Sequence, residues 1–337
     1  MRIIKNSKVC VIGGAGFLGS HLVNHLIDDR NCEVLVLDNL ITGKKEFLHP
    51  KSRFIWCDIT GSEYQLFKIF KKYDIEYVFN YAAEPYIPVS FERPLHVFNI
   101  NAMGALKVLN AAQDAGVKGI LQVSSAEIYG DAKEKVSEDS PARPHSTYGV
   151  AKLAIDLLVQ CRWKESNTPA IAMRQFNCVG ERETHPYVIP EIIQQISKQN
   201  IGNAILFLPK EKIKEKPAIV KLGNNSFRDF QYAGDAVKMA TELLEKGQFG
   251  EVYNMGSEEG IQIYDLAKVI GNIMGKEIAV EVDESRIRPW EIWHLQSDNT
   301  KLYNIIESRP KVSLNEALQK TVIDYQKNGW VWKNINN

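Results

Sequence analysis

The sequence predicts an α/β protein built on a doubly wound parallel sheet. Short, continuously apolar segments alternate with amphipathic ones in the first half of the chain, and a glycine-rich turn joins the first apolar segment to the first helix. Continuously apolar strands are typical of a sheet that helices cover on both faces. With 337 residues, 45% of them hydrophobic, the chain has enough material for one large α/β unit or two domains.

The expected strands are short and mostly apolar. They are Lys8–Ile12, Glu33–Leu37, Phe54–Cys57, Tyr77–Tyr81, Ile120–Ser124, Ala170–Phe176 and Glu251–Met255. The first expected helix carries Leu18, Leu22 and Leu26 at four-residue spacing, which places them on one face. Further helices are expected at about Asn101–Ala115, Tyr148–Gln160, Ile189–Lys198, Asp235–Glu245 and Tyr264–Met274.

The pattern loosens after about Asn177, which predicts two domains. The first is expected to comprise residues 1–176 together with about 233–255, and the second residues 177–232 and 256–337. The charged segment Leu208–Pro217 is expected to be a solvated loop or hairpin. The chain is therefore predicted to leave the first domain, return to it, and leave it again, so that the second domain is a smaller, discontinuous α/β unit.

Composition excludes several classes of function. Lys+Arg and Asp+Glu both number 41, so no net field favours nucleic acid or an anionic membrane. No apolar stretch approaches the ~18 residues that span a bilayer, and the N-terminus does not resemble a secretion signal. The five cysteines lack C-x-x-C spacing and are expected to be buried thiols of a cytoplasmic protein. No His/Cys/Asp cluster has metal-ligand spacing, so no metal is expected.

The glycine turn predicts a dinucleotide site of the Rossmann type. Gly13, Gly16 and Gly19 follow a strand and open a helix, with Phe17 and Leu18 between the last two. Such glycines let the turn close and let a pyrophosphate approach the backbone and the helix N-terminus. The second strand leads to Asp38, 19 residues after Gly19, where a carboxylate binds a ribose diol.

Asp38 also favours NAD over NADP, because its charge would repel a 2′-phosphate; the nearby Lys44 and Lys45 keep NADP open. Other cofactor contacts are expected at the ends of the second, third and fourth strands. They are Asn39, Asp58, Ile59, Tyr81, Ala82 and Ala83.

Tyr148 and Lys152 form a Y-x-x-x-K pattern on a predicted helix, where the spacing puts both side chains on one face. An ammonium group and a nicotinamide cation nearby would lower the pKa of the phenol and suit it to take a proton from a substrate hydroxyl. Ser125 ends the fifth strand, where a parallel sheet presents groups to a ligand, and is expected to share that proton.

Together these motifs resemble the extended short-chain dehydrogenase/reductase family, specifically its NAD-dependent nucleotide-sugar epimerases and dehydratases. The resemblance extends from Val9 to about Trp332 and includes "AAEPYIPVSFERP" (82–94), "RQFNCVG" (174–180), "FRDFQYAGD" (227–235) and "RPWEIWHLQSDNTK" (288–301). It implies a nucleotide-diphosphate sugar as substrate and a homodimer formed by the helices at about 101–115 and 148–160.

The resemblance also implies further site residues. Arg228 and Arg288 are expected to hold the diphosphate, because guanidinium groups make bidentate phosphate contacts. Asn99 is expected to contact the cofactor, and Asn177 the sugar or its phosphate. The other expected substrate contacts are Glu84, Tyr86, His185, Val188 and Glu291, with an ordinary loop histidine as the alternative for His185.

Glu127 favours a dehydratase, which oxidises C4 of the sugar, eliminates water across C5 and C6, and returns the hydride. It stands where dehydratases and decarboxylases of the resembling family carry a glutamate that serves as the extra base. Ala126 stands where related 4,6-dehydratases carry an aspartic acid or a serine. Glu127 is then expected to do both proton transfers, unless another group serves, as in a 5,6-dehydratase.

Three alternatives remain open at this point: a 4-epimerase, a decarboxylase and a non-catalytic NAD-binding protein. A 4-epimerase needs no base beyond Tyr148, since the 4-keto sugar only rotates in the site and takes the hydride back on its other face. The non-catalytic alternative is disfavoured because Ser125, Tyr148 and Lys152 are all present.

Overall fold

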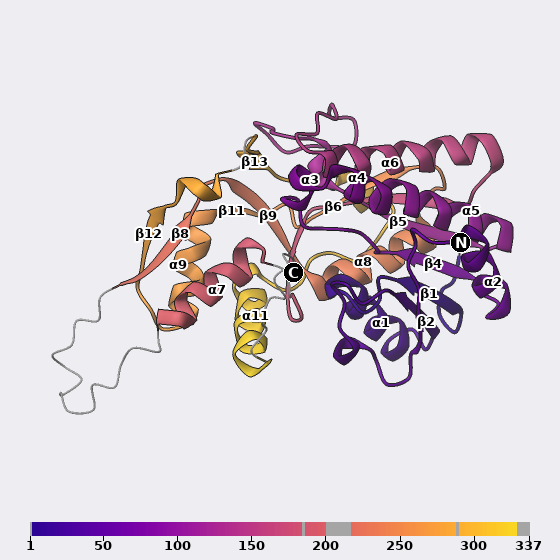
Figure 1. Cartoon of the computed structure of the whole chain (residues 1–337), viewed down its shortest axis with the longest axis horizontal. Helices are drawn as coiled ribbons and strands as arrows, with labels where there is room; N and C mark the ends of the chain where they lie inside the picture. Colours follow the sequence, from indigo (N-terminus) through magenta and orange to yellow (C-terminus); the bar gives the residue numbers. More distant parts are fainter. Residues whose placement is uncertain (1, 184–185, 200–216, 288–289, 329–337) are drawn as a thin grey trace.

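The computed structural model describes residues 2–183, 186–199, 217–287 and 290–328. Its larger part is a seven-stranded parallel sheet in the order β10-β6-β5-β4-β1-β2-β3 (Figure 1). These strands are β1 (Lys8–Ile12), β2 (Glu33–Asp38), β3 (Arg53–Trp56), β4 (Tyr77–Asn80), β5 (Gly119–Ser125), β6 (Ala170–Gln175) and β10 (Val252–Met255). The strand order reverses between β1 and β4, which is where doubly wound sheets bind ligands. The predicted fold class is confirmed.

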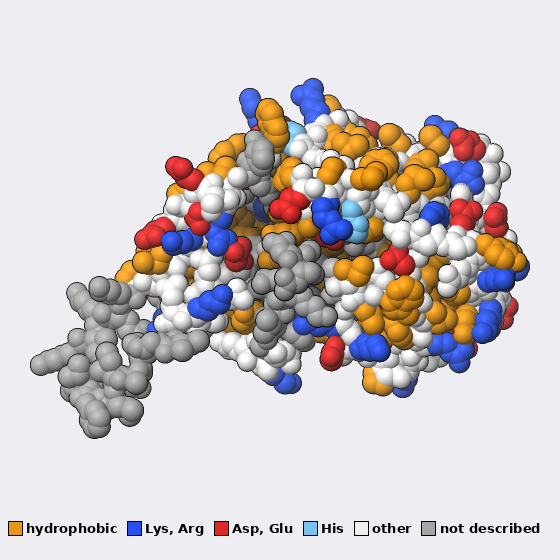
Figure 2. Space-filling model, in the orientation of Figure 1, with side chains coloured by type: hydrophobic (Ala, Val, Ile, Leu, Met, Phe, Trp, Pro, Cys, Tyr) orange, Lys and Arg blue, Asp and Glu red, His pale blue; other side chains and the backbone are white. Residues whose placement is uncertain are grey.

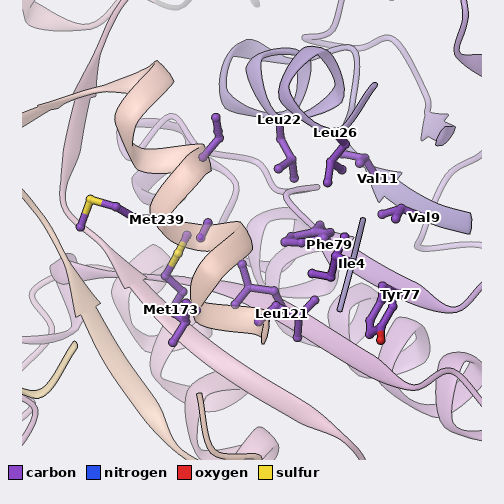
Figure 3. Close-up of a cluster of buried hydrophobic side chains, with 14 of the residues drawn as sticks. Ile4, Val9, Val11, Leu22, Leu26, Tyr77, Phe79, Leu121, Met173 and Met239 are labelled. Atoms are coloured by element: carbon purple, nitrogen blue, oxygen red, sulfur yellow. The ribbon is translucent and has the colours of Figure 1, made fainter. Parts of the chain in front are cut away.

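Helices cover both faces of this sheet. The helices α1 (Phe17–Asp28) and α8 (Ala233–Lys246) lie on one face, and α2 (Glu63–Lys72), α5 (Ala105–Ala115) and α6 (Thr147–Ser166) lie on the other. On the first face, Leu22 and Leu26 of α1 pack with Met239 of α8 and Phe79 of β4 (Figure 3). Burial on both faces explains why the strands are continuously apolar.

The rest of the chain forms a smaller unit with its own core. One small sheet joins β7 (Asn177–Val179), β9 (Phe227–Tyr232), β11 (Gly260–Gln262) and β13 (His294–Leu295), and β8 (Ala218–Leu222) pairs with β12 (Ile278–Val282). The helices α7 (Val188–Gln199), α9 (Ile263–Ile273) and α11 (Leu314–Asn328) cover these strands. This core lies within the stretches expected for the second domain; the division into two domains stays a prediction. The segment expected as a solvated loop lies outside the described residues, apart from Pro217.

Short helical segments complete the chain. They are η1 (Lys45–Phe47), α3 (Val89–Glu92), α4 (Pro94–Phe98), η2 (Asn99–Gly104), η3 (Ala126–Ile128), η6 (Glu284–Arg286) and α10 (Thr300–Tyr303). The segment η2 is a π-helix, so the helix predicted from about Asn101 begins with a widened turn before α5. Such widened turns are frequent at functional sites.

The cysteines depart in part from the expectation that all are buried thiols. Cys10, Cys32 and Cys57 are buried and free, whereas Cys178 is half-buried and Cys161 is exposed. Cys161 lies on the outer side of α6, where helix periodicity and not local hydrophobicity decides exposure. Among the described helices, none is both long and apolar enough to cross a membrane.

Candidate active site

A cavity of about 760 Å³ runs along the carboxyl ends of the parallel strands, between the large sheet and the smaller unit. This volume lies within the usual range of small-molecule sites, and the position is the one expected for a doubly wound sheet. The predicted site residues that line it are Gly13, Gly16, Phe17, Leu18, Gly19, Asp38, Asn39, Asp58, Ile59, Tyr81, Ala82, Ala83, Glu84, Tyr86, Ser125, Glu127, Tyr148, Lys152, Asn177, Val188, Arg228 and Glu291.

Three predicted residues are not among them. Asn99 is exposed and does not line the cavity, so its expected cofactor contact has no support in this geometry. It belongs to the π-helix η2, in which Asn101, two residues further on, is the buried asparagine and bonds to Glu84. Arg288 and His185 lie outside the described residues.

The glycine turn is built so tightly that side chains do not fit. Gly13 has a φ of +77°, and a Cβ there would lie 2.7 Å from the backbone nitrogen of Ala82. A Cβ on Gly19 would lie 2.1 Å from the carbonyl oxygen of Gly13, so this glycine lets α1 pack on β1. At Gly16, a Cβ would meet only the Gly13 oxygen, at 3.2 Å, and would otherwise project into open space. The turn thus leaves a backbone cradle at the N-terminus of α1, as a pyrophosphate requires.

Asp38 is fixed by the backbone around it. Its two carboxylate oxygens accept hydrogen bonds from Ala15 N at 3.0 Å and Leu40 N at 2.8 Å. Burial raises the pKa of Asp38, and these two hydrogen bonds act in the opposite direction. Beside it, Asn39 donates from Nδ2 to Asp58 at 3.0 Å, which links the ends of β2 and β3. The oriented carboxylate and the glycine cradle together fit a dinucleotide with a free ribose diol.

Tyr148 and Lys152 lie one turn apart on α6, whose start is fixed by Ser146. The Ser146 hydroxyl accepts a hydrogen bond from Gly149 N at 3.1 Å as an N-cap. Lys152 donates to the Val123 carbonyl at 3.1 Å, and its Nζ lies 5.8 Å from the centre of the Tyr148 ring. Burial lowers the pKa of Lys152 to about 8.

The phenol of Tyr148 differs from the expectation in one respect. Burial raises its pKa above the usual 10, and a side-chain hydrogen bond with Ser125 acts in the opposite direction. In the protein alone, desolvation therefore outweighs the lowering expected from the neighbouring lysine. A nicotinamide cation bound beside the phenol would act to lower this pKa.

Glu127 lies on the Tyr148 side of the cavity. It is half-buried in η3, and its backbone nitrogen donates to the Ser125 hydroxyl at 3.2 Å. Its charge helps to raise the pKa of Tyr148, so the carboxylate is within electrostatic reach of the phenol. The Ser125 hydroxyl therefore bonds both the Tyr148 side chain and the backbone of Glu127.

Glu84 is held by a residue that the sequence analysis missed. The amide of Asn101 accepts from Glu84 N at 2.8 Å and donates to the Glu84 carbonyl at 3.0 Å. The Glu84 carboxylate accepts from Tyr86 N at 3.1 Å, and burial raises its pKa. Tyr187, also missed, donates its hydroxyl to the Pro85 carbonyl at 2.9 Å and packs edge-on against Tyr86. These contacts fix the loop after β4.

A buried ion pair fixes α6 on the sheet. Arg174 of β6 donates to Asp156 of α6 at 2.8 Å and to the Tyr129 hydroxyl at 2.8 Å. Tyr129 in turn donates to Asn254 of β10 at 2.6 Å. Because Asp156 lies one turn beyond Lys152, this network positions the helix that carries both predicted catalytic side chains.

The opposite wall carries arginine side chains. Arg228 on β9 lies 3.6 Å from the Glu291 carboxylate. Arg286, which the sequence analysis missed, also lines the cavity and pairs with Glu191 and with Asp283. This wall therefore presents two guanidinium groups, each paired with a carboxylate, and such groups can make bidentate contacts to phosphate.

The missed residues lack a local sequence signal. Arg286 has no motif beyond its charge, and nothing in the local sequence distinguishes Asn101, which is buried, from Asn99, which is exposed. Among the described residues, no group of three or more His, Cys, Asp or Glu side chains is arranged to hold a metal ion.

The fold and the site define an NAD-dependent enzyme, with a Tyr–Lys pair that lines the same cavity as the glycine turn and Asp38. Comparison with known proteins agrees, because residues 9–256 match the model of the NAD-dependent epimerase/dehydratase family. The chain belongs to this family, a branch of the extended short-chain dehydrogenases/reductases.

Relatives with two different activities match nearly the whole chain. The dTDP-D-glucose 4,6-dehydratase of Mus musculus is 29% identical over 97% of this chain and 91% of its own. A UDP-glucose 4-epimerase of Lactobacillus helveticus is 28% identical over 96% of each chain. The structure of a Thermus thermophilus UDP-glucose 4-epimerase in complex with NAD superposes with a TM-score of 0.82 at 27% identity, covering 95% of this chain and 99% of the other. These matches support a nucleotide-sugar epimerase or dehydratase that uses NAD.

Proposed function

We propose that the protein is a nucleotide-sugar dehydratase that oxidises C4 and eliminates water across C5 and C6. The observation that carries the proposal is the position of Glu127, a carboxylate that lines the cavity within electrostatic reach of Tyr148. A dehydratase needs such an additional base beside the sugar, whereas an epimerase does not.

The residues divide the proton transfers between them. NAD supplies the hydride acceptor and donor when it is bound. Tyr148 takes the proton of the C4 hydroxyl, with Ser125 sharing it. The resulting ketone acidifies the C5 hydrogen, and the Glu127 carboxylate removes that proton. The C6–O bond then breaks, and the same proton leaves with the hydroxyl as water, so Glu127 ends as it began. The C4 hydride then returns from the bound cofactor to C6 while a proton from solvent adds to C5, so the product is lighter by one water only.

A 4-epimerase is the second candidate, and the residue before Glu127 favours it. Ala126 offers no acid, although related 4,6-dehydratases carry an aspartic acid or a serine at that position. Without an acid there, the leaving hydroxyl depends on Glu127 alone. If Glu127 only accepts hydrogen bonds from the sugar, the ketone can do no more than turn over and be reduced on its other face.

Mass spectrometry and NMR of the products separate the two candidates. The purified protein is incubated with UDP-, GDP-, dTDP- and CDP-sugars in H2O and in D2O. The dehydratase proposal expects a product lighter by one water, deuterium uptake at C5, and loss of both in Glu127→Gln. Glu134→Gln, an exposed glutamate in the same region, is the control. An isobaric product with inverted C4 and no deuterium contradicts the proposal and makes the protein an epimerase.

We also propose that the protein is a homodimer through the surface of α4, η2 and α6. Large apolar side chains are exposed there: Leu95 at 82%, Met103 at 46%, Val150 at 45% and Leu157 at 49%. Val150 and Leu157 are seven residues apart and therefore share one face of α6. Hydrophobic side chains gather over this part of the surface in Figure 2.

Light scattering tests the dimer. The wild-type protein is expected at twice the 38.2 kDa of the chain, and the double variant Val150→Glu, Leu157→Glu at the monomer mass. Ile323→Glu, an exposed apolar residue of α11, is the control and should leave the dimer intact. A monomeric wild-type protein contradicts the proposal.

A further inference from the structure

Glu183 is a buried glutamate in the cavity wall that the proposed reaction does not use. It lies between β7 and α7, lines the cavity, and is only 6% exposed. Its Oε2 atom is buried and has no hydrogen-bond partner among the described residues. Native proteins satisfy nearly all buried polar atoms, so an unpartnered oxygen in a cavity wall indicates a partner that binds there.

The environment of Glu183 determines its protonation. Burial raises the pKa of this carboxyl group well above its ordinary value. Burial thus favours the uncharged form of the carboxyl group, which has one O–H donor and remaining acceptor capacity. Such a group matches a neutral ligand group that both donates and accepts, such as a hydroxyl or an amide.

Glu183 borders the part of the cavity that contains Tyr148. Glu183, Glu84 and Tyr148 all help to raise the pKa of Tyr187, so all three lie within electrostatic reach of its phenol. Glu183 also raises the pKa of Cys178, another lining residue. Because Tyr148 has to reach a sugar hydroxyl, the sugar ring must lie in this part of the cavity.

We propose that Glu183 is a specificity-determining residue whose free carboxyl oxygen forms a hydrogen bond with a neutral hydroxyl or amide substituent of the sugar. The inference rests on the proposed function only in that the cavity binds a nucleotide-sugar, and it holds for a dehydratase and an epimerase alike.

Binding measurements test this role without depending on turnover. The affinity of the NADH-loaded protein for each UDP-, GDP-, dTDP- and CDP-sugar is measured by calorimetry for the wild type, Glu183→Gln and Glu183→Leu. We expect Glu183→Gln to bind like the wild type, because an amide also donates and accepts. We expect Glu183→Leu to bind roughly tenfold to a hundredfold more weakly, because the substituent loses its partner, with its affinity for NADH unchanged.

A neighbouring glutamate is the matched control. Glu181 does not line the cavity and accepts a hydrogen bond from the Tyr232 hydroxyl at 3.1 Å. Glu181→Gln should therefore leave nucleotide-sugar affinity unchanged.

Substrate analogues identify the substituent. For the sugar that binds, analogues with hydroxyl, acetamido or hydrogen at one ring position are compared. The wild type should discriminate among them at one position, and Glu183→Leu should not. This inference alone is overturned if the wild type binds a nucleotide-sugar and Glu183→Leu binds it equally well. It is also overturned if Glu183→Leu loses affinity for NADH, or thermal stability, as much as it loses affinity for the nucleotide-sugar. If no nucleotide-sugar binds the wild type, the proposed function fails as well.

Discussion

The two walls of the cavity hold ligand groups in different ways. On the wall of the large sheet, the backbone makes the site: Gly13 and Gly19 exclude side chains, and backbone N–H groups fix Asp38. On the opposite wall, side chains make it: Arg228 pairs with Glu291, and Arg286 pairs with Glu191. The first wall suits a cofactor of constant shape. On the second wall, substitution of a few side chains is enough to change which ligand binds. This agrees with a family whose members act on different nucleotide-sugars.

The largest expected effect on activity comes from Tyr148, which lies on the wall of the large sheet. Tyr148→Phe should lower kcat on the substrate found in the panel by roughly a hundredfold to ten-thousandfold, because it removes the proton acceptor. Affinity for NADH, measured by fluorescence titration, should stay within a factor of about two, since the helix packing is kept. Activity close to that of the wild type would show that another group takes the proton.

Changing Asp38 tests whether the wall of the large sheet selects NAD over NADP. Asp38→Ala should weaken NADH binding roughly tenfold to a hundredfold, because the ribose diol loses a charged acceptor. The variant should also reduce the preference for NADH over NADPH, since the carboxylate that repels the 2′-phosphate is removed. Fluorescence titration with both cofactors measures this. An unchanged ratio of the two dissociation constants would refute the assignment of Asp38.

Changing Arg228 tests whether the wall formed by the smaller unit contacts the substrate and not the cofactor. Arg228→Met should raise KM for the nucleotide-sugar roughly tenfold, with the affinity for NADH unchanged, because one charge-assisted phosphate contact is lost. Kinetics at saturating NAD together with the NADH titration separate these effects. A weakened NADH affinity with constant KM would place the diphosphate elsewhere.

The smallest effect concerns stability and involves Lys152. Burial lowers its pKa from 10.5 to about 8, so between these values the unfolded chain binds a proton that the folded protein has released. This residue therefore makes the free energy of unfolding rise with pH across that window, by up to about 1.4 kcal/mol per pH unit. Urea unfolding should show the wild type gaining stability over Lys152→Met as the pH rises above about 8. Parallel pH profiles for the two proteins would contradict the lowered pKa.

Local patterns made some parts of the structure predictable. The seven strands of the large sheet could be predicted to within one residue at each end, because each is a continuous apolar segment that two helix layers bury. The strands of the smaller unit, such as β7 and β13, have three and two residues. Such short strands carry no periodicity, so only their pairing with β9 identifies them.

The sequence by itself determined the cofactor and the chemical class, because Gly13, Gly16, Gly19, Asp38, Tyr148 and Lys152 act through fixed spacing along a strand, a turn and a helix. Only the tertiary structure decided which side chains meet across the cavity. Asn101 bonds to the loop after β4, and Arg286 and Glu183 line the cavity, because separate segments converge there. Contacts between residues far apart in the chain depend on packing, which no local spacing encodes.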